Sequence, residues 1–473
     1  MDDPSTPPPA EFDPASPHHT QPKLRPVQGF RAEANGQPVL GIRDVQQISE
    51  RVVFTGAVAQ FLLPSMDGDH TVDQIVEEAA GRAQDAGAPE PALQALTVDA
   101  TQQLIAQLDG AGLLEGPRFD ELLAKLRDDF DASDVLPPGP TADFADAIVT
   151  HAAKQAGEDE PGEEVKAERS PAALRTQLEA WCNQALEPVT DPSFDALPRA
   201  IIAPHSDYQR GWLNYAHAYG RMRVADPPDR IVILGVNHHG RGTGVVGCDK
   251  GYRTPLGTCG FDTELDTALR EALGPADTER YYAERFDHER EPSVEFQLPW
   301  LQHAFGPPEL PESTDASAYP KVLAALMYDM TANGAEPTTE AGMPLETFVA
   351  ALRTAIDRVG GRTLIVAAAE LSHVGRGYGD QQSFAGDDDA AKAFRDKVVT
   401  HDREMLKAVE EGKPDELLTA FAWNGNWSRW TGLGPLVAAM KLVPGERVKM
   451  LNYAAAADNQ GVAMISSIAG AIG

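Results

Sequence analysis

Cysteine is scarce in this chain of 473 residues, which contains only Cys182, Cys248 and Cys259. A small and odd number of thiols argues against a disulfide framework and fits a reducing compartment. The spacing between Cys248 and Cys259 matches no zinc motif. The three cysteines are therefore expected to be structural free thiols.

Long apolar runs are also missing. No uncharged apolar stretch reaches the ~18–20 residues that a membrane-spanning helix needs, and the first residues lack the basic and apolar regions of a signal peptide. Residues 462–472 are mostly apolar but too short to cross a bilayer, so they are predicted to belong to the core. These features predict a cytoplasmic protein without a membrane partner.

Basic residues are outnumbered by acidic ones. The 40 Lys and Arg residues stand against 72 Asp and Glu residues, which gives a formal net charge of −32. Such a charge repels nucleic acid and anionic lipid, so no nucleic-acid partner is expected. The acidic residues are spread along the chain, which is typical of a well-solvated surface.

Composition divides the chain into four regions. The first residues are rich in Pro, Ser, Thr and His, cannot bury a core, and leave His18 and His19 in solvent. A Pro-Gly break and an acidic run separate two segments with regular apolar patterns. The predicted divisions are a disordered tail at 1–28, a small α-rich domain at 30–130, a linker at 131–170 and an α/β domain at 171–473.

The small domain carries helix and strand signals. Residues 39–42 predict a short strand, and residues 45–63 have apolar side chains at roughly helical spacing. Thr71, with Gln74 three residues later, is typical of a helix start. Residues 96–108 predict another amphipathic helix.

Four short motifs follow one another in this domain. They are Phe61-Leu62-Leu63, Met66-Asp67-Gly68, Thr71-Val72-x-x-Ile75 and Leu104-x-x-x-Leu108-x-x-x-Gly112-Leu113-Leu114. Their order resembles the PqqD-like winged-helix fold, a small peptide-binding module. A generic helical domain is the alternative.

Two patterns alternate in the α/β domain. Compact apolar runs bounded by turn signals are typical of buried strands, and amphipathic stretches between them predict helices. Such alternation predicts a mainly parallel sheet with helices on both faces. The strands are predicted at 200–203, 230–234, 322–327 and 363–368, and the helices at 174–186, 215–222 and 348–359.

Three of the apolar runs lead directly to a histidine. These are His205, His238 and His373, and Glu370 comes three residues before the last of them. Open parallel sheets bind ligands beyond the carboxyl ends of their strands. A lone histidine is usually a satisfied polar group, but three in corresponding positions predict a common pocket.

An ordered set of motifs runs through the same domain. It consists of Pro204-His205-x-x-Tyr208, Ile233-Leu234-Gly235-x-x-His238-His239, Thr254-Pro255-Leu256-Gly257, Glu291-x-Ser293-x-Glu295-x-x-Leu298-Pro299, Leu371-Ser372-His373-x-Gly375 and Leu451-Asn452-Tyr453. The set resembles the MEMO family, also described as AmmeMemoRadiSam system protein B. That family's fold is similar to the fold of class III extradiol dioxygenases, which use non-haem iron.

The resemblance implies a site and partners. It implies that His205 and His238 bind a divalent metal, with Fe(II) as the expected ion, and that His373 is an acid/base or substrate group. It also implies a radical-SAM protein as partner and a peptide or small molecule as substrate. The motifs further place His239, Tyr208, Glu291 and Glu295 in the pocket.

The chain departs from the family pattern at three positions. Thr431 stands where the family usually has a cysteine available to the metal, and threonine is a poor ligand for a borderline metal. Pro292 stands where the family has a pocket histidine, while His288 lies four positions away. Asp207 replaces the family's usual glycine in the first histidine motif.

Asp207 allows two interpretations. With His205 and His238 it has the composition of a two-histidine-one-carboxylate triad, which holds Fe(II) and leaves positions open. Alternatively, Asp207 only adopts the backbone conformation of the glycine, since Asp enters left-handed space more readily than most residues. Glu370 and Glu291 are further candidate oxygen donors.

Two functions remain open. The first is a metal-dependent oxidoreductase in which His205 and His238 bind the metal, His373 moves protons, and Glu370 or Asp207 completes the site. The second is a non-catalytic protein that binds a peptide or small molecule in a degenerate pocket. A metal-dependent hydrolase is a third option, but no nucleophile motif supports it.

Overall fold

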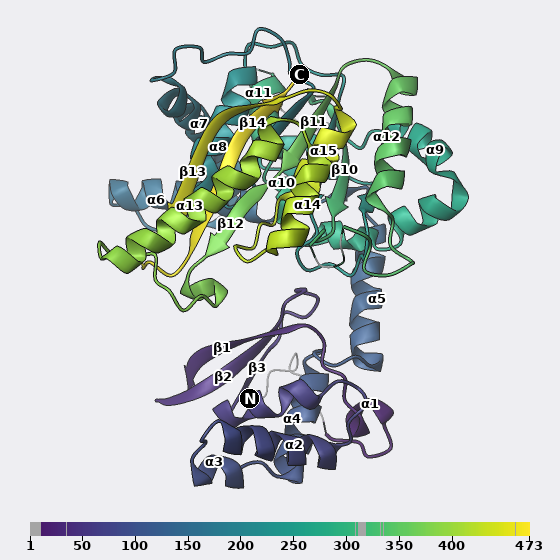
Figure 1. The fold of residues 1–473 in the computed structure, drawn as a ribbon, viewed down its shortest axis with the longest axis vertical. Coiled ribbons are helices and arrows are strands. Elements are labelled where there is room, and N and C mark those ends of the chain that lie inside the picture. Colours follow the sequence, from purple (N-terminus) through teal and green to yellow (C-terminus); the bar gives the residue numbers. More distant parts are fainter. Residues whose placement is uncertain are drawn as a thin grey trace. The chain divides into compact units, whose positions relative to one another are not determined.

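The structure is a computed structural model that describes residues 11–34, 36–307, 309–310, 318–331, 333, 335–458 and 460–473. The chain forms two compact units, Met1–Ala132 and Ser133–Gly473 (Figure 1). Each unit has a hydrophobic core of its own. None of the helices in the described ranges combines the length and the apolar character that a bilayer crossing requires.

The N-terminal unit packs a small antiparallel sheet against helices. Ile42 and Val53 of the sheet are buried together with Ile75 and Leu108 of the helices. The strands run in the order β1 (Val27–Ala34), β2 (Gln37–Asp44), β3 (Val52–Thr55). The helices are α1 (Pro17–Thr20), α2 (Val72–Asp85), α3 (Glu90–Gln94), α4 (Val98–Gly110) and α5 (Pro117–Asp131), with 3-10 turns η1 (Ala57–Phe61) and η2 (Leu63–Ser65).

The helix start at Thr71 is confirmed. Its side chain accepts from the main-chain N–H of Gln74, whose Oε1 accepts from the N–H of Thr71 at 2.9 Å. The helix expected over residues 45–63 is wrong, because Val52 and Val53 pair with β2 and only short 3-10 turns follow. Pairing with a neighbouring strand outweighs local periodicity for β-branched residues.

Residues 11–28 are ordered, so the expectation of a disordered tail is wrong for them. Lys23 and Leu24 form bridges to Asp67 and Leu114, and the side chain of Leu24 packs against the core of the unit. His19 was expected in solvent but is buried, and its Nδ1 accepts from the N–H of Asp13 at 2.8 Å. Residues 1–10 of the expected tail lie outside the described residues.

The segment expected to be a linker consists largely of helices of the C-terminal unit. After β4 (Val135–Leu136), α6 (Pro140–Ala156) buries Ala145 and Val149, and α7 (Glu163–Leu186) follows it. The ring of Phe144 stacks on Trp181 at 5.6 Å. Pro140 stands at the first helical position, where the fixed proline φ favours a helix start and does not break it.

The C-terminal unit is built on one mixed sheet. Within the described residues this sheet has eight strands, in the order β12-β14-β5-β11-β6-β10-β7, and β13 pairs with β14. The central pairs β5–β11, β11–β6 and β6–β10 are parallel, whereas the pairs that involve β7, β12, β13 or β14 are antiparallel. The prediction of a mainly parallel sheet therefore holds for the centre and is wrong for the edges.

The predicted strands coincide with the central ones. The observed bounds are β5 (Ala200–Ala203), β6 (Arg230–Val236), β10 (Lys321–Met327) and β11 (Thr363–Ala368), and the outer strands are β7 (Val246–Cys248), β12 (Glu370–Val374), β13 (Val448–Ala457) and β14 (Met464–Ile472). Every residue of β14 is buried, which confirms residues 464–472 as part of the core, whereas Val462 is exposed. In a small separate sheet, β8 (Gly251–Thr254) pairs with β4 on one side and with β9 (Gly257–Cys259) on the other.

Helices cover both faces of the main sheet. Alternate strand residues such as Ile202, Val232 and Ile365 join the core formed with α12 and α15. Figure 1 shows α13, α14 and α15 in front of the sheet and α7 and α8 behind it. The bounds are α8 (Tyr208–Tyr219), η3 (Gly220–Met222), α9 (Thr263–Tyr282), η4 (Arg285–Glu289), α10 (Pro292–Glu295), α11 (Leu298–Phe305), α12 (Leu345–Val359), η6 (Arg376–Tyr378), α13 (Asp389–Glu410), α14 (Pro414–Asn424) and α15 (Leu433–Leu442).

Candidate functional site

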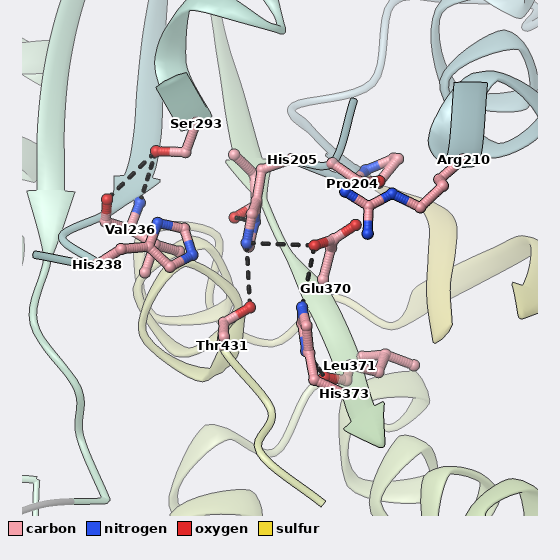
Figure 2. Close-up of polar contacts among 12 residues, drawn as sticks. Pro204, His205, Arg210, Val236, His238, Ser293, Glu370, Leu371, His373 and Thr431 are labelled. Carbon is pink, nitrogen blue, oxygen red and sulfur yellow. Dashed lines mark hydrogen bonds and ion pairs between the residues drawn. The ribbon is translucent and has the colours of Figure 1, made fainter. Parts of the chain in front are cut away.

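The carboxyl ends of three neighbouring strands bring the predicted histidines together. β5, β11 and β6 are adjacent, and His205 and His238 each lie two residues beyond the end of their strand. Their ring centroids are 5.0 Å apart. His373 lies in β12, which starts two residues after β11 (Figure 2). The structure therefore brings the three histidines to one edge of the sheet, and their sharing of one pocket stays a prediction.

His205 is a buried imidazole with a defined tautomer. Its Nδ1 lies 3.1 Å from the carbonyl oxygen of Ala368, which can only accept, so Nδ1 carries the proton. Nε2 then accepts from the hydroxyl of Thr431 at 3.0 Å. Burial lowers the pKa of His205 to about 4, although Glu370 favours the charged form. His205 is therefore neutral near pH 7.

The carboxylate of Glu291 contacts both the ring and the main chain of His238. Nδ1 of His238 lies 3.0 Å from the carboxylate, and the main-chain N–H of His238 donates to the same group at 3.1 Å. Burial opposes the charged form of His238, but Glu291 outweighs this effect and raises the pKa. Burial also opposes the charge of Glu291, yet His238 and hydrogen bonds lower the pKa of that carboxyl to about 2.

Glu370 lies between His205 and His373. Its Oε2 is 3.6 Å from Nε2 of His205 and 3.3 Å from Nε2 of His373. Burial opposes the charge, but the two histidines overcome this effect and lower the pKa of Glu370 to about 2. Its other oxygen, Oε1, is buried and has no hydrogen-bond partner among the residues that the structure describes.

Main-chain carbonyls fix the ring of His373. Its Nδ1 lies 3.0 Å from the carbonyl oxygens of Leu371 and Arg429, so Nδ1 carries a proton and Nε2 faces Glu370. Arg429 has a φ of 59°, a left-handed conformation that is uncommon for a residue with a side chain. The loop before Thr431 thus contains one residue with left-handed backbone next to the site.

The donor set fits a divalent metal in its chemistry. His205, His238 and His373 all place Nδ1 on a fixed acceptor, which leaves Nε2 as the nitrogen for a metal and matches the outer-shell pattern of metal-binding histidines. Of these, Nε2 of His205 accepts from Thr431. The unpartnered Oε1 of Glu370 adds a carboxylate oxygen. The donors are nevertheless spread out. In the ranges the structure describes, only His18, His19 and Asp109 form a set of three potential ligands within 4.8 Å of one another.

Asp207 does not join this group. It caps the N-terminus of α8 by accepting from the N–H of Arg210 at 3.1 Å, and its carboxylate forms an ion pair with the same residue at 2.5 Å. Its side chain is 43% exposed. Its φ of −53° is not left-handed, so neither interpretation from the sequence describes its position. The start of α8 at Tyr208 explains it, because an aspartate there satisfies free N–H groups of the first turn.

Three other residues that the motifs placed in the pocket have different surroundings. Tyr208 is buried among aromatic rings and donates to the carbonyl of Phe296 at 2.8 Å. Glu295 accepts from the main chain of Thr141 at 3.0 Å and so anchors the start of α6. His239 is exposed, and its ring centroid lies 6.0 Å from that of His238. His288 is buried, and its ring nitrogens contact the hydroxyl of Tyr252 and the carbonyl of Val246.

Arg210 is a site residue that the sequence patterns did not reveal. Its guanidinium points to the side of Glu370 opposite His205 in Figure 2. Burial disfavours its charge, but Asp207 and then Glu370 outweigh this effect and raise the pKa of Arg210. The only feature of the sequence that pointed to Arg210 as a site residue was its position five residues after His205, in the first turn of α8.

Comparison with known proteins identifies the family. A family model described as Memo-like protein matches residues 167–471. The chain belongs to this family. A MEMO1 family protein of Methanopyrus kandleri is 29% identical over 299 residues, which cover 62% of this chain and 89% of the relative. One of Methanocaldococcus jannaschii is 28% identical over 270 residues, covering 56% and 79%.

A shorter match reaches higher identity. A MEMO1 family protein of Methanothermobacter thermautotrophicus is 36% identical over 140 residues, which cover 29% of this chain and 48% of the relative. The matched Memo-like residues lie wholly in the C-terminal unit, which contains the three histidines. The family resemblance read from the motifs is thereby confirmed.

Proposed function

We propose that the C-terminal unit is a metal-dependent oxidoreductase, with His205 and His238 as metal ligands and Fe(II) as the preferred ion. One observation carries this proposal: each of the three imidazoles has its Nδ1 within 3.1 Å of a fixed acceptor, so Nε2 is the nitrogen for a ligand, and at His205 a metal would displace the hydroxyl of Thr431. A bound Fe(II) would supply positions for O₂ and a substrate, as in the class III extradiol dioxygenases that the family resembles.

Glu370 and His373 have different roles in the proposed site. Glu370 brings one negative charge to the pocket and completes the donor set in place of a cysteine. His373 holds a proton at Nδ1 against two carbonyls and exchanges a second one at Nε2, which faces Glu370 at 3.3 Å. Proton exchange at this atom is the acid/base role that we assign to His373.

Metal analysis of anaerobically purified protein tests the proposal. We expect about one iron per chain, lost in His205→Ala and in His238→Ala. His239→Ala is the matched control, because this exposed neighbour lies outside the donor set and its variant should keep the metal. Wild-type protein without stoichiometric metal after anaerobic preparation and iron loading would overturn the proposal.

A non-catalytic binding protein is the second candidate. The hydroxyl of Thr431 occupies the lone pair of His205 at 3.0 Å, which favours a pocket that no longer binds metal. In this case the pocket binds a peptide or small molecule. The PqqD-like resemblance of the N-terminal unit favours a peptide as the ligand of the pocket. A radical-SAM partner would supply that peptide. Turnover of any substrate with added iron and O₂ contradicts this candidate, whereas peptide binding to metal-free protein supports it.

A further inference from the structure

A buried carboxylate lies behind the site. Asp402, on α13, is 0% exposed and receives four side-chain hydrogen bonds. All four donors are neutral groups, so neutral hydrogen bonds compensate its burial. The donors are Ser372 Oγ at 2.6 Å, Trp430 Nε1 at 2.8 Å, Tyr453 OH at 2.8 Å and Ser466 Oγ at 2.5 Å.

Two of these donors are direct neighbours of site residues. Ser372 precedes His373, and Trp430 precedes Thr431. The indole N–H of Trp430 can only donate, so an acceptor is required at this point. One carboxylate therefore joins β12 to the loop 428–431, although the two segments lie more than fifty residues apart in the sequence.

The joined segments also contact each other at the site. The main-chain N–H of His373 donates to the carbonyl of Ser428 at 2.7 Å, and Nδ1 of His373 meets the carbonyl of Arg429 at 3.0 Å. These contacts set the tautomer of His373. They require the loop to stay in place with Arg429 in its left-handed conformation.

We propose that Asp402 is a positioning residue, which holds Ser372 and Trp430 so that His373 keeps its Nδ1–H tautomer and Thr431 reaches His205. This inference deepens the proposed function, since it rests on His373 and Thr431 belonging to the working site. A buried carboxylate costs desolvation that an apolar side chain of similar size does not. Its four donors hold the carboxylate in one position. Two of these donors, Ser372 and Trp430, lie in the segments that contain His373 and Thr431.

The tautomer of His373 provides a readout that does not depend on metal or activity. In metal-free protein labelled with ¹⁵N-histidine, the imidazole ¹⁵N shifts at one fixed pH distinguish Nδ1–H from Nε2–H, and His373→Gln assigns the signal. We expect wild type to show the Nδ1–H form. Asp402→Asn, Ser372→Ala and Trp430→Phe should lower the ratio of Nδ1–H to Nε2–H about tenfold, the effect of losing one buried hydrogen bond.

Two further variants separate positioning from stability. Tyr453→Phe removes a hydrogen bond to the same carboxylate from β13, which holds no site residue, so it should lower stability without changing the His373 signal. Asp396→Asn changes an exposed residue on the same helix and should change neither. If Asp402→Asn does not fold, Ser372→Ala and Trp430→Phe still decide the question.

Two outcomes contradict the proposal. An unchanged His373 tautomer in both Ser372→Ala and Trp430→Phe overturns it, and so does an equal change in Tyr453→Phe. Iron content measured on the same proteins reports on the proposed function separately. A tautomer change in a protein that never binds iron would keep Asp402 as a positioning residue and reject the oxidoreductase.

Discussion

Thr431 donates a hydrogen bond from its hydroxyl to Nε2 of His205 over 3.0 Å. The bond fills the lone pair that a metal would use, at the position where the family pattern has a cysteine. A hydroxyl binds soft and borderline metals poorly, whereas a thiolate binds them well. If the pocket binds metal as proposed, this pair of residues sets how strongly it does so.

Thr431→Cys should strengthen metal binding. It removes the hydroxyl from His205 and supplies a sulfur ligand, so the gain should at least match the about 10–100-fold effects that outer-shell changes have on metal affinity. Competition with a chelator measures it. Thr431→Val, which frees His205 without adding a ligand, is the control, and equal affinities of the two variants would contradict the reasoning.

Glu370→Gln and Asp207→Ala should have opposite consequences. Glu370 faces both His205 and His373, so Glu370→Gln should abolish iron binding. Asp207 caps α8 and binds Arg210, so Asp207→Ala should keep the iron and lower stability by about 1 kcal/mol, the usual cost of losing an N-cap. Metal analysis and denaturant unfolding distinguish them; loss of iron in Asp207→Ala alone would make Asp207 the ligand.

His288 should make the fold acid-sensitive. Burial lowers its pKa from 6.5 to about 4, so between these values the unfolded chain binds a proton that the folded chain excludes. The stability contributed by neutral His288 is present above pH 6.5 and is lost as pH falls toward 4. Unfolding free energies measured from pH 7 to pH 4 should therefore fall less steeply in His288→Gln. Parallel curves for the two proteins would refute this assignment.

The three thiols should be unreactive in the folded protein. Cys182, Cys248 and Cys259 are free and buried, and burial raises the pKa of each to about 12. The thiolate is the reactive form, so a disulfide reagent at pH 8 should modify none of them in native protein and all three after denaturation. A native thiol that reacts within minutes would show that its surroundings open.

The central strands could be predicted almost residue by residue. Residues 200–203 and 363–368 coincide with β5 and β11, because a buried parallel strand is a continuous apolar run that is visible locally. The positions of His205 and His238 just beyond such strands followed from the same pattern. The antiparallel strands β12 and β14 did not, since their pairing joins residues about ninety positions apart.

The carboxylates show where local reasoning ends. Asp207 lies two residues from His205 and yet binds Arg210, because α8 begins there and its first turn needs a cap. Glu370 is distant from His205 in sequence but lies beside it, because β5 and β11 are neighbours in the sheet. Within the linker expected at 131–170, a short helix at 144–156 was foreseen and agrees with α6, but the packing of α6 on α7 through Phe144 and Trp181 was not visible in any local pattern.

The sequence by itself determined the family, the central strands and the three histidines at one edge of the sheet, because each depends on short motifs and local apolar patterns. Only the tertiary structure decided which nitrogen each imidazole presents and which carboxylate faces it. It also decided that the hydroxyl of Thr431 donates to Nε2 of His205. These properties depend on hydrogen bonds between segments brought together by the packing of the sheet, and a local pattern carries no information about them.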